Sequence, residues 1–112
     1  MRDNLVYLQH ILDSVGKIEK YLKEVSFDNF TQNEMMVGAT VRELEIIGEA
    51  ATKIDKIIKE KYRDVPWDEM IGMRHRLIHE YFGVDISVVW ETCQNNLPDL
   101  KEKILSIVET EK

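Results

Sequence analysis

The chain has 112 residues, of which 44% are hydrophobic and 32% charged, with only five glycines and two prolines. This composition is typical of one folded domain covering residues 1–112 and excludes a disordered chain. The 15 basic and 21 acidic residues leave a formal charge of −6. That balance argues against nucleic-acid binding through a broad basic surface, so any such role requires a local cluster of positive charge.

No segment reaches the roughly 18 apolar residues that a membrane span requires. The N-terminal residues carry acids at amphipathic spacing and do not form the apolar core of a signal peptide. We therefore expect a cytoplasmic protein that makes no contact with membranes. The single cysteine, Cys93, excludes an intrachain disulfide and lies in an apolar helical pattern, which indicates a packed core residue.

The first predicted helix covers residues 3–25. His10 lies between apolar neighbours there and is interpreted as structural, and the segment 26–30 then interrupts the pattern. Thr31 and Glu34 have the spacing of a capping box for the next helix, and Asn33 is the alternative cap. The apolar residues of the first helix recur at the spacing of one helix face; they are Leu5, Leu8, Ile11, Leu12, Val15, Ile18, Leu22 and Val25.

A second helix is predicted from about residue 33 to Tyr62, which is long for a globular domain. Gly38 and Gly48 lie inside it, and an interior glycine costs up to about 1 kcal/mol relative to alanine. Such glycines either let a neighbouring helix or a second subunit approach closely, or they bend the helix. The apolar face of this helix consists of Leu44, Ile47, Ala51, Ile54 and Ile58, with Met36, Ala39 and Ile57 close to the same side.

Two or three further helical segments follow. Pro66 ends the second helix, and a short third helix is predicted over Trp67–His79. Asp85 is a suitable N-cap for a fourth helix, which Pro98 either kinks or divides to begin a fifth. No segment has the pattern of a strand. The sequence therefore predicts an all-α protein, a four- to five-helix up-and-down bundle.

The polar residues at the end of the third predicted helix are unusual, because Arg74, His75, Arg76, His79 and Tyr81 fall close together. At about 100° per residue, Arg74 and His79 lie about 140° apart around a helix. They converge on one target only if the helix unwinds near His79 or if a second subunit brings another copy alongside.

Such a pair has the chemistry to cleave RNA. A histidine with a pKa of about 6.5 can remove the proton of a 2′-hydroxyl, which then attacks its own phosphate, and another can protonate the leaving oxygen. An arginine can bind the non-bridging oxygens that carry the developing charge. The step requires no metal ion, and its use of the 2′-hydroxyl favours RNA over DNA.

The same residues have structural interpretations. Arg74 could form a surface ion pair, His79 could lie favourably at a helix C-terminus, and Tyr81 could be a half-buried aromatic. His75 and His79 are also spaced as a possible metal pair, but Glu80 is the single third ligand nearby in the sequence.

The ordered motifs of this chain resemble the HepT-like toxins of the HEPN superfamily, over nearly its whole length. Arg-x4-His followed by x-Tyr is weak by itself, but the complete set of blocks is specific. The blocks are residues 42–50 of the second helix, Pro66-Trp67, the run from Gly72 through Arg74 to Tyr81, and then Asp85 and Trp90.

The resemblance implies a HEPN-like bundle and a homodimer whose two motifs meet in a cleft and act as a metal-independent endoribonuclease without a cofactor. Arg74 and His79 would be catalytic. The protein would be the toxin of a toxin–antitoxin system whose partner, a minimal nucleotidyltransferase, inactivates it by transferring AMP to Tyr81. The alternative is a non-catalytic subunit that binds the nucleotidyltransferase.

One position departs from the family pattern, because His75 stands where asparagine or another small polar residue is usual. This histidine either weakens a positioning hydrogen bond or supplies a second proton-transfer group. His75 and Arg76 are therefore expected to support the site. Two copies of Arg74 and Arg76, together with Arg42, would concentrate positive charge on an otherwise acidic protein.

Overall fold

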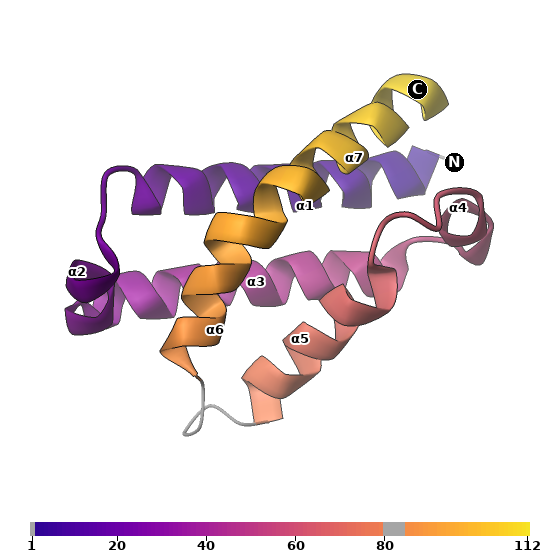
Figure 1. Cartoon of the computed structure of the whole chain (residues 1–112). Helices are drawn as coiled ribbons and strands as arrows, with labels where there is room; N and C mark the ends of the chain where they lie inside the picture. The colour runs from indigo at the N-terminus through magenta and orange to yellow at the C-terminus, as the bar shows by residue number, and fades with distance from the viewer. Residues whose placement is uncertain (1, 80–84) are drawn as a thin grey trace.

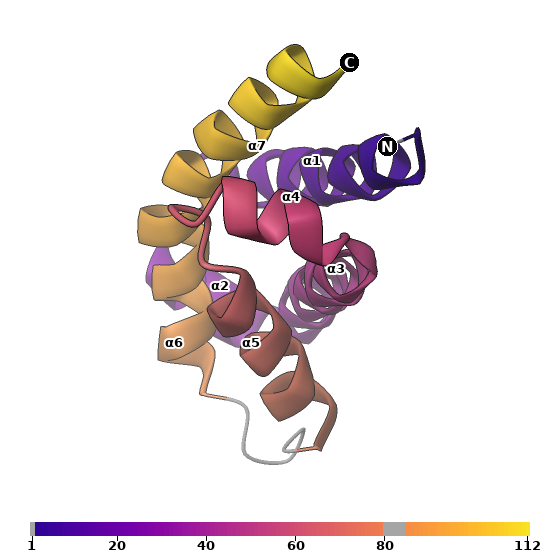
Figure 2. The same cartoon turned by 90° about the vertical axis from the view of Figure 1, so that its right-hand side faces the viewer.

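The computed structural model describes residues 2–79 and 85–112, with the backbone alone for residue 2 and residues 77–79. Within these ranges the chain is helical and contains no strand, so the predicted all-α bundle is confirmed. Helices α1 (Arg2–Leu22) and α3 (Glu34–Lys53) lie side by side in opposite directions (Figure 1). Helix α5 (Trp67–His79) packs against α3, and α7 (Leu97–Glu111) packs against α1. Both termini lie at the same end of the bundle (Figures 1 and 2).

The core follows the apolar faces that the sequence predicts. On α1 the buried residues are spaced by three or four positions, and Leu8, Ile11 and Val15 are fully inaccessible to solvent. Leu44, Ile47 and Ala51 form the facing stripe of α3. Burial of large apolar side chains contributes about 1.5–3 kcal/mol each relative to exposure, which is why these stripes fix how the helices pair.

The segment interpreted as an interruption after the first helix forms a short helix of its own, α2 (Phe27–Gln32). Ser26 caps it by accepting a hydrogen bond from the backbone N–H of Asn29 at 3.2 Å. Phe30 is then fully buried, with its ring centroid 5.2 Å from that of Trp90. Asn33 caps α3 through the backbone N–H of Met36 at 3.0 Å, so the second of the two predicted caps is the one used.

The prediction of one helix from residue 33 to residue 62 is wrong. Helix α3 ends at Lys53, the backbone of Ile54 is extended, and a separate helix α4 (Lys56–Lys61) follows. Buried Asn4 of α1 stabilises the break: its side chain donates to the carboxylate of Asp55 at 3.1 Å and accepts from the Asp55 backbone N–H at 2.9 Å. The break also reorients α4, so that Ile57, expected near the buried face, is 72% exposed.

After residue 84 the chain forms one bent helical run. Asp85 caps α6 (Ile86–Glu91) as predicted, accepting from the backbone N–H of Ser87 at 2.9 Å. A π-helical turn, η2 (Thr92–Asn96), links α6 directly to α7, which has Pro98 in its first turn. Proline lacks the N–H that an uninterrupted α-helix would use, and a π turn absorbs this loss without ending the helix.

Cys93 is buried in this π turn, and burial raises the pKa of its thiol to about 12. The thiol is therefore neutral at physiological pH, as expected for a packing residue. No helix in the described ranges is both long and apolar enough to cross a membrane.

Candidate functional site

Helix α5 approaches α3 closely where Arg74 of α5 faces Gly48 of α3. A Cβ atom added to Gly48 would lie 2.3 Å from the Cβ of Arg74 and 2.9 Å from the carbonyl oxygen of Met70. No side chain larger than hydrogen fits there without movement of the backbone. Of the two alternatives given above for the interior glycines, close approach by a neighbouring helix is therefore the one that holds at Gly48. For Gly38, no heavy atom of the described residues lies within 4 Å of an added Cβ, so Gly38 makes no such contact among them.

The close approach places Arg74 beside Glu49, the next residue of α3. The guanidinium Nη2 lies 2.7 Å from the Glu49 Oε2, with side chains 32% and 48% exposed respectively. An ion pair this exposed contributes only about 0–1 kcal/mol to stability. Its effect is to orient Arg74, whose guanidinium has five N–H donors and keeps several for a further anion.

Arg74 lies at the edge of a groove of about 520 Å³ between α1, α3 and α5. We refer to it as the α1–α3 groove. Tyr7 and His10 come from α1, with ring centroids 5.8 Å apart in an edge-to-face arrangement. His10, interpreted above as structural, is exposed to solvent. The remaining lining residues are Arg42, Glu45, Ile46, Glu49, Ala50 and Lys53 of α3.

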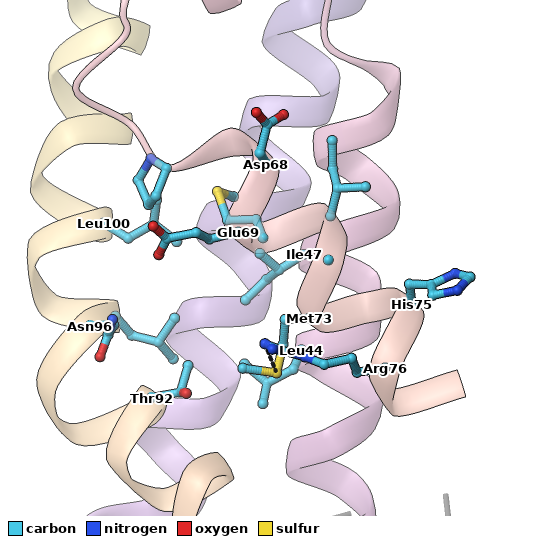
Figure 3. Close-up of a pocket in the computed structure, with 15 residues that line it drawn as sticks. Leu44, Ile47, Asp68, Glu69, Met73, His75, Arg76, Thr92, Asn96 and Leu100 are labelled. Carbon is cyan, nitrogen blue, oxygen red and sulfur yellow. Dashed lines mark hydrogen bonds between the residues drawn. The ribbon is translucent and has the colours of Figure 1, made fainter. Parts of the chain in front are cut away.

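His75 and Arg76 line a different cavity of about 920 Å³, bounded by α3, α5, η2 and α7, which we refer to as the α5–α7 cavity. Figure 3 shows Arg76 directed toward Met73, with its Nη2 3.9 Å from the Met73 sulfur, and the His75 ring pointing away from the cavity. The floor is apolar and includes Leu44, Ile47 and Leu100. The structure thus brings Arg42 together with Arg74 and places Arg76 elsewhere.

His79 is the last residue of α5, and its side chain lies outside the described part of the chain, as does the whole of Tyr81. Because α5 is helical through His79, the two motif positions 74 and 79 differ by about 140° around its axis. Unwinding ahead of His79 therefore does not bring them together in this chain. Among the residues that the structure describes, no three of His, Cys, Asp and Glu are arranged to hold a metal ion.

Sequence reasoning gave no role at the site to most of the residues that share the groove with Arg74, among them Tyr7, His10, Glu49 and Lys53. Tyr7 and His10 are far from the motif in sequence and reach it only because α1 and α3 pack antiparallel. Glu49 and Lys53 lie on the exposed side of α3, where a charged residue is ordinary. The one available signal was Gly48, because it marks where α5 must approach.

Comparison with known proteins places this chain in a family. The family model described as "Ribonuclease HepT-like" matches residues 11–107. A protein of Caldanaerobacter subterraneus subsp. tengcongensis named "Putative RNase" is 42% identical over 95% of each chain. The "Probable ribonuclease HepT" of Thermococcus cleftensis is 40% identical over 91% of this chain and 93% of its own.

A third relative, from Methanocaldococcus jannaschii, is named as a gamma-glutamylcyclotransferase and putative RNase; it is 43% identical over 96% of this chain but only 49% of its own length. No solved structure matches the chain. The extent of the family match and the identity of full-length relatives lead to one conclusion. The chain belongs to the HepT-like ribonuclease family.

Proposed function

We propose that this chain is the ribonuclease toxin of a two-component toxin–antitoxin system and cleaves RNA in the cytoplasm through Arg74 and His79. The observation that carries the proposal is the placement of Arg74 in a member of the HepT-like ribonuclease family. Gly48 and Glu49 hold this arginine at the edge of an open groove, where its remaining N–H donors can reach a phosphate.

The catalytic unit of this proposal is a homodimer. Helix α5 separates Arg74 and His79 by about 140° around its axis, so one copy does not aim both at the same phosphate. A second copy that brings its own α5 alongside supplies the missing partner. The two copies also add their positive charges at one place on a chain whose formal charge is −6.

In the proposed reaction one histidine removes the proton of the 2′-hydroxyl. The 2′-oxygen forms a bond to phosphorus, the bond to the 5′-oxygen breaks, and the leaving oxygen takes a proton from a second histidine. The products are a 2′,3′-cyclic phosphate and a 5′-hydroxyl. Arg74 donates hydrogen bonds to the non-bridging oxygens, and the step balances without a metal ion or cofactor.

Control of the toxin is assigned to Tyr81. A nucleotidyltransferase partner that transfers AMP to this tyrosine would place a bulky anionic group two residues beyond His79. That group would compete with an RNA phosphate for the same cations. His75 and Arg76 are supporting residues in this proposal, since they add one proton-transfer group and one positive charge on the neighbouring faces of α5.

The test is cleavage of RNA by the purified protein in EDTA, with analysis of the ends. The parent should leave cyclic phosphates, and Arg74→Ala and His79→Ala should each lower the rate by about 100-fold or more, because each removes a group that acts on the transition state. Arg63→Ala, at an exposed arginine outside both cavities, is the matched control and should cleave as the parent does. Undiminished cleavage by the Arg74 and His79 variants would show that the site is wrongly assigned.

The same assay separates toxin from binding subunit. Incubation with the nucleotidyltransferase and ATP should stop cleavage by the parent and add AMP, whereas Tyr81→Phe should stay active and unmodified. A parent that binds the nucleotidyltransferase but never cleaves RNA is a regulatory subunit, and the proposal is then wrong.

A further inference from the structure

Of the two hollows described above beside α5, one is lined by Arg74 and the other is not. The arginine lines the α1–α3 groove, whereas the next two residues of α5 line the α5–α7 cavity. On its inner side the Arg74 stem is pressed against the α3 backbone at Gly48. A phosphate bound by the guanidinium within the α1–α3 groove would therefore have the rest of its strand lie along the surface of that groove.

The groove concentrates positive charge on an acidic chain. Three cationic side chains line it against two carboxylates, whereas acidic residues outnumber basic ones 21 to 15 in the whole protein. Arg42 and Lys53 are exposed and form no ion pair with any residue that the structure describes. They lie on α3 on either side of Glu49, separated by about 16 Å of helix axis at 1.5 Å per residue. A strand with one phosphate on Arg74 would thus find a cation in each direction.

The α1 side of the groove is aromatic. Tyr7 and His10 meet edge to face at 5.8 Å, with His10 exposed and Tyr7 half-buried against the core. Aromatic side chains next to backbone-binding cations are the usual platform for unpaired bases. Glu45 and Glu49 cannot bind phosphate, but their oxygens can accept hydrogen bonds from ribose hydroxyls and base amino groups. This combination fits an unpaired strand, because base faces are not available in a duplex.

From this arrangement we propose that the α1–α3 groove is a binding subsite for single-stranded RNA, holding the nucleotides on either side of the cleaved phosphate. Arg42 and Lys53 bind the neighbouring phosphates, and Tyr7 with His10 stacks a base. The proposal rests on the ribonuclease function proposed above, and it assigns substrate binding to residues outside the Arg-x4-His motif.

The test measures binding apart from cleavage. A fluorescent single-stranded RNA is titrated, over a series of salt concentrations, with protein carrying His79→Ala, and a gel checks that the RNA stays intact. Adding Arg42→Gln with Lys53→Gln should weaken binding about tenfold. It should also reduce the slope of log affinity against log salt by about 1.4, because two phosphate contacts are lost. Adding Tyr7→Leu should weaken binding about fivefold or more at unchanged slope, since stacking releases no counterions.

The control pair Lys23→Gln with Arg63→Gln removes the same charge at exposed positions outside the groove and should bind as the His79→Ala protein does. Thermal unfolding checks that each variant is folded. Equal binding by the groove and control pairs overturns the subsite. So does a groove pair that binds RNA normally but no longer binds the nucleotidyltransferase, which would make the groove a protein-docking surface.

Cleavage by the protein with an intact His79 keeps the two proposals distinguishable. If this protein cleaves RNA but the groove pair binds normally, the subsite alone is wrong. If it binds RNA through the groove without cleaving, the subsite stands and the catalytic assignment is wrong. If it neither binds nor cleaves RNA, both are wrong.

Discussion

At the scale of single residues, the candidate site depends on the absence of a side chain at Gly48. Gly48 leaves room for the Cβ of Arg74. With the stem of Arg74 held there, its guanidinium reaches Glu49, the next residue of α3, at the groove. The arginine was identifiable from the sequence by its motif, but its surroundings were not. Periodicity places a residue on a face of its own helix and gives no information about which distant face it meets.

Replacement of Gly48 by alanine should therefore be costly. The new Cβ would lie 2.3 Å from the Arg74 Cβ, so α5 must shift outward, and we expect a loss of about 1–3 kcal/mol in the free energy of unfolding. RNA cleavage should fall together with stability, because Arg74 moves. Chemical denaturation and the cleavage assay provide the two measurements.

Gly38→Ala is the matched control, since it lies in the same helix and no described atom lies within 4 Å of an added Cβ. There the change should be neutral or stabilising by up to about 1 kcal/mol, because alanine favours the helix. If both alanine variants are equally stable, the close contact at Gly48 is not a constraint.

At the scale of helices, the sequence predicted where most elements begin and failed where a distant residue decides the end. Helix α5 and the Asp85 cap follow the prediction, because their signals are local. The break between α3 and α4 does not, since Asn4 makes it from 51 positions away. The π turn ahead of Pro98 was also unresolved, because a proline signals a disturbance without specifying how the backbone absorbs it.

Asn4 is therefore expected to contribute more to the free energy of unfolding than a surface polar residue on the same helix does. Its side chain is 2% exposed and holds both the backbone and the carboxylate of Asp55. Asn4→Ala removes both hydrogen bonds to Asp55 and should lower the free energy of unfolding by about 1–3 kcal/mol. Urea denaturation measures the change.

The comparison is Gln9→Ala, which removes an exposed hydrogen bond to Asp13 on the same helix and should change stability by no more than about 0.5 kcal/mol. Similar values for the two variants would mean that the α3–α4 break does not depend on Asn4.

At the scale of the whole molecule, the end of the last helix is tied to the middle of the chain. The Lys61 ammonium lies 2.6 Å from the Glu111 carboxylate, and the Tyr62 hydroxyl donates to the same oxygen. The hydrogen bond from Lys61, and to a lesser extent that from Tyr62, lowers the pKa of Glu111. The same contacts raise the pKa of Lys61 and of Tyr62. These contacts are therefore complete where Glu111 is ionised and both Lys61 and Tyr62 are protonated, which excludes strongly acidic and strongly alkaline pH.

This tie should appear in the pH dependence of stability. A carboxyl group with a lowered pKa stabilises the fold above its unfolded pKa of about 4.3 and loses that effect as the pH falls through the folded value. The stability difference between the parent and Glu111→Gln should hold between about pH 6 and pH 8 and shrink below about pH 4. Denaturation at several pH values measures it.

Glu102→Gln, at an exposed residue of the same helix, is the control and should show no such acid-dependent difference. A Glu111→Gln difference that stays constant down to the acid range would indicate that Lys61 and Tyr62 do not stabilise the charged carboxylate.

Over the whole chain, the class of fold followed from apolar periodicity alone, because buried stripes such as Ile11–Val15 and Leu44–Ile47 record which faces meet. The site did not follow in the same way. Arg74 and Arg76 are two positions apart in the sequence, but they open into different hollows, and residues of α1 complete the one that holds Arg74. The positions of charged residues along one helix do not indicate which other helix they will face. The groove is therefore visible only once the helices are packed.

The glycine beneath Arg74 also provides a way to sort related sequences. A chain can keep the motif arginine and histidine and still have lost the arrangement if a bulkier residue occupies the position of Gly48. Such a chain would carry the signature of a nuclease without a place for its arginine. Positions 48 and 74 are twenty-six residues apart. Inspecting them together distinguishes a chain that has kept only the motif residues from one that also has room for the arginine.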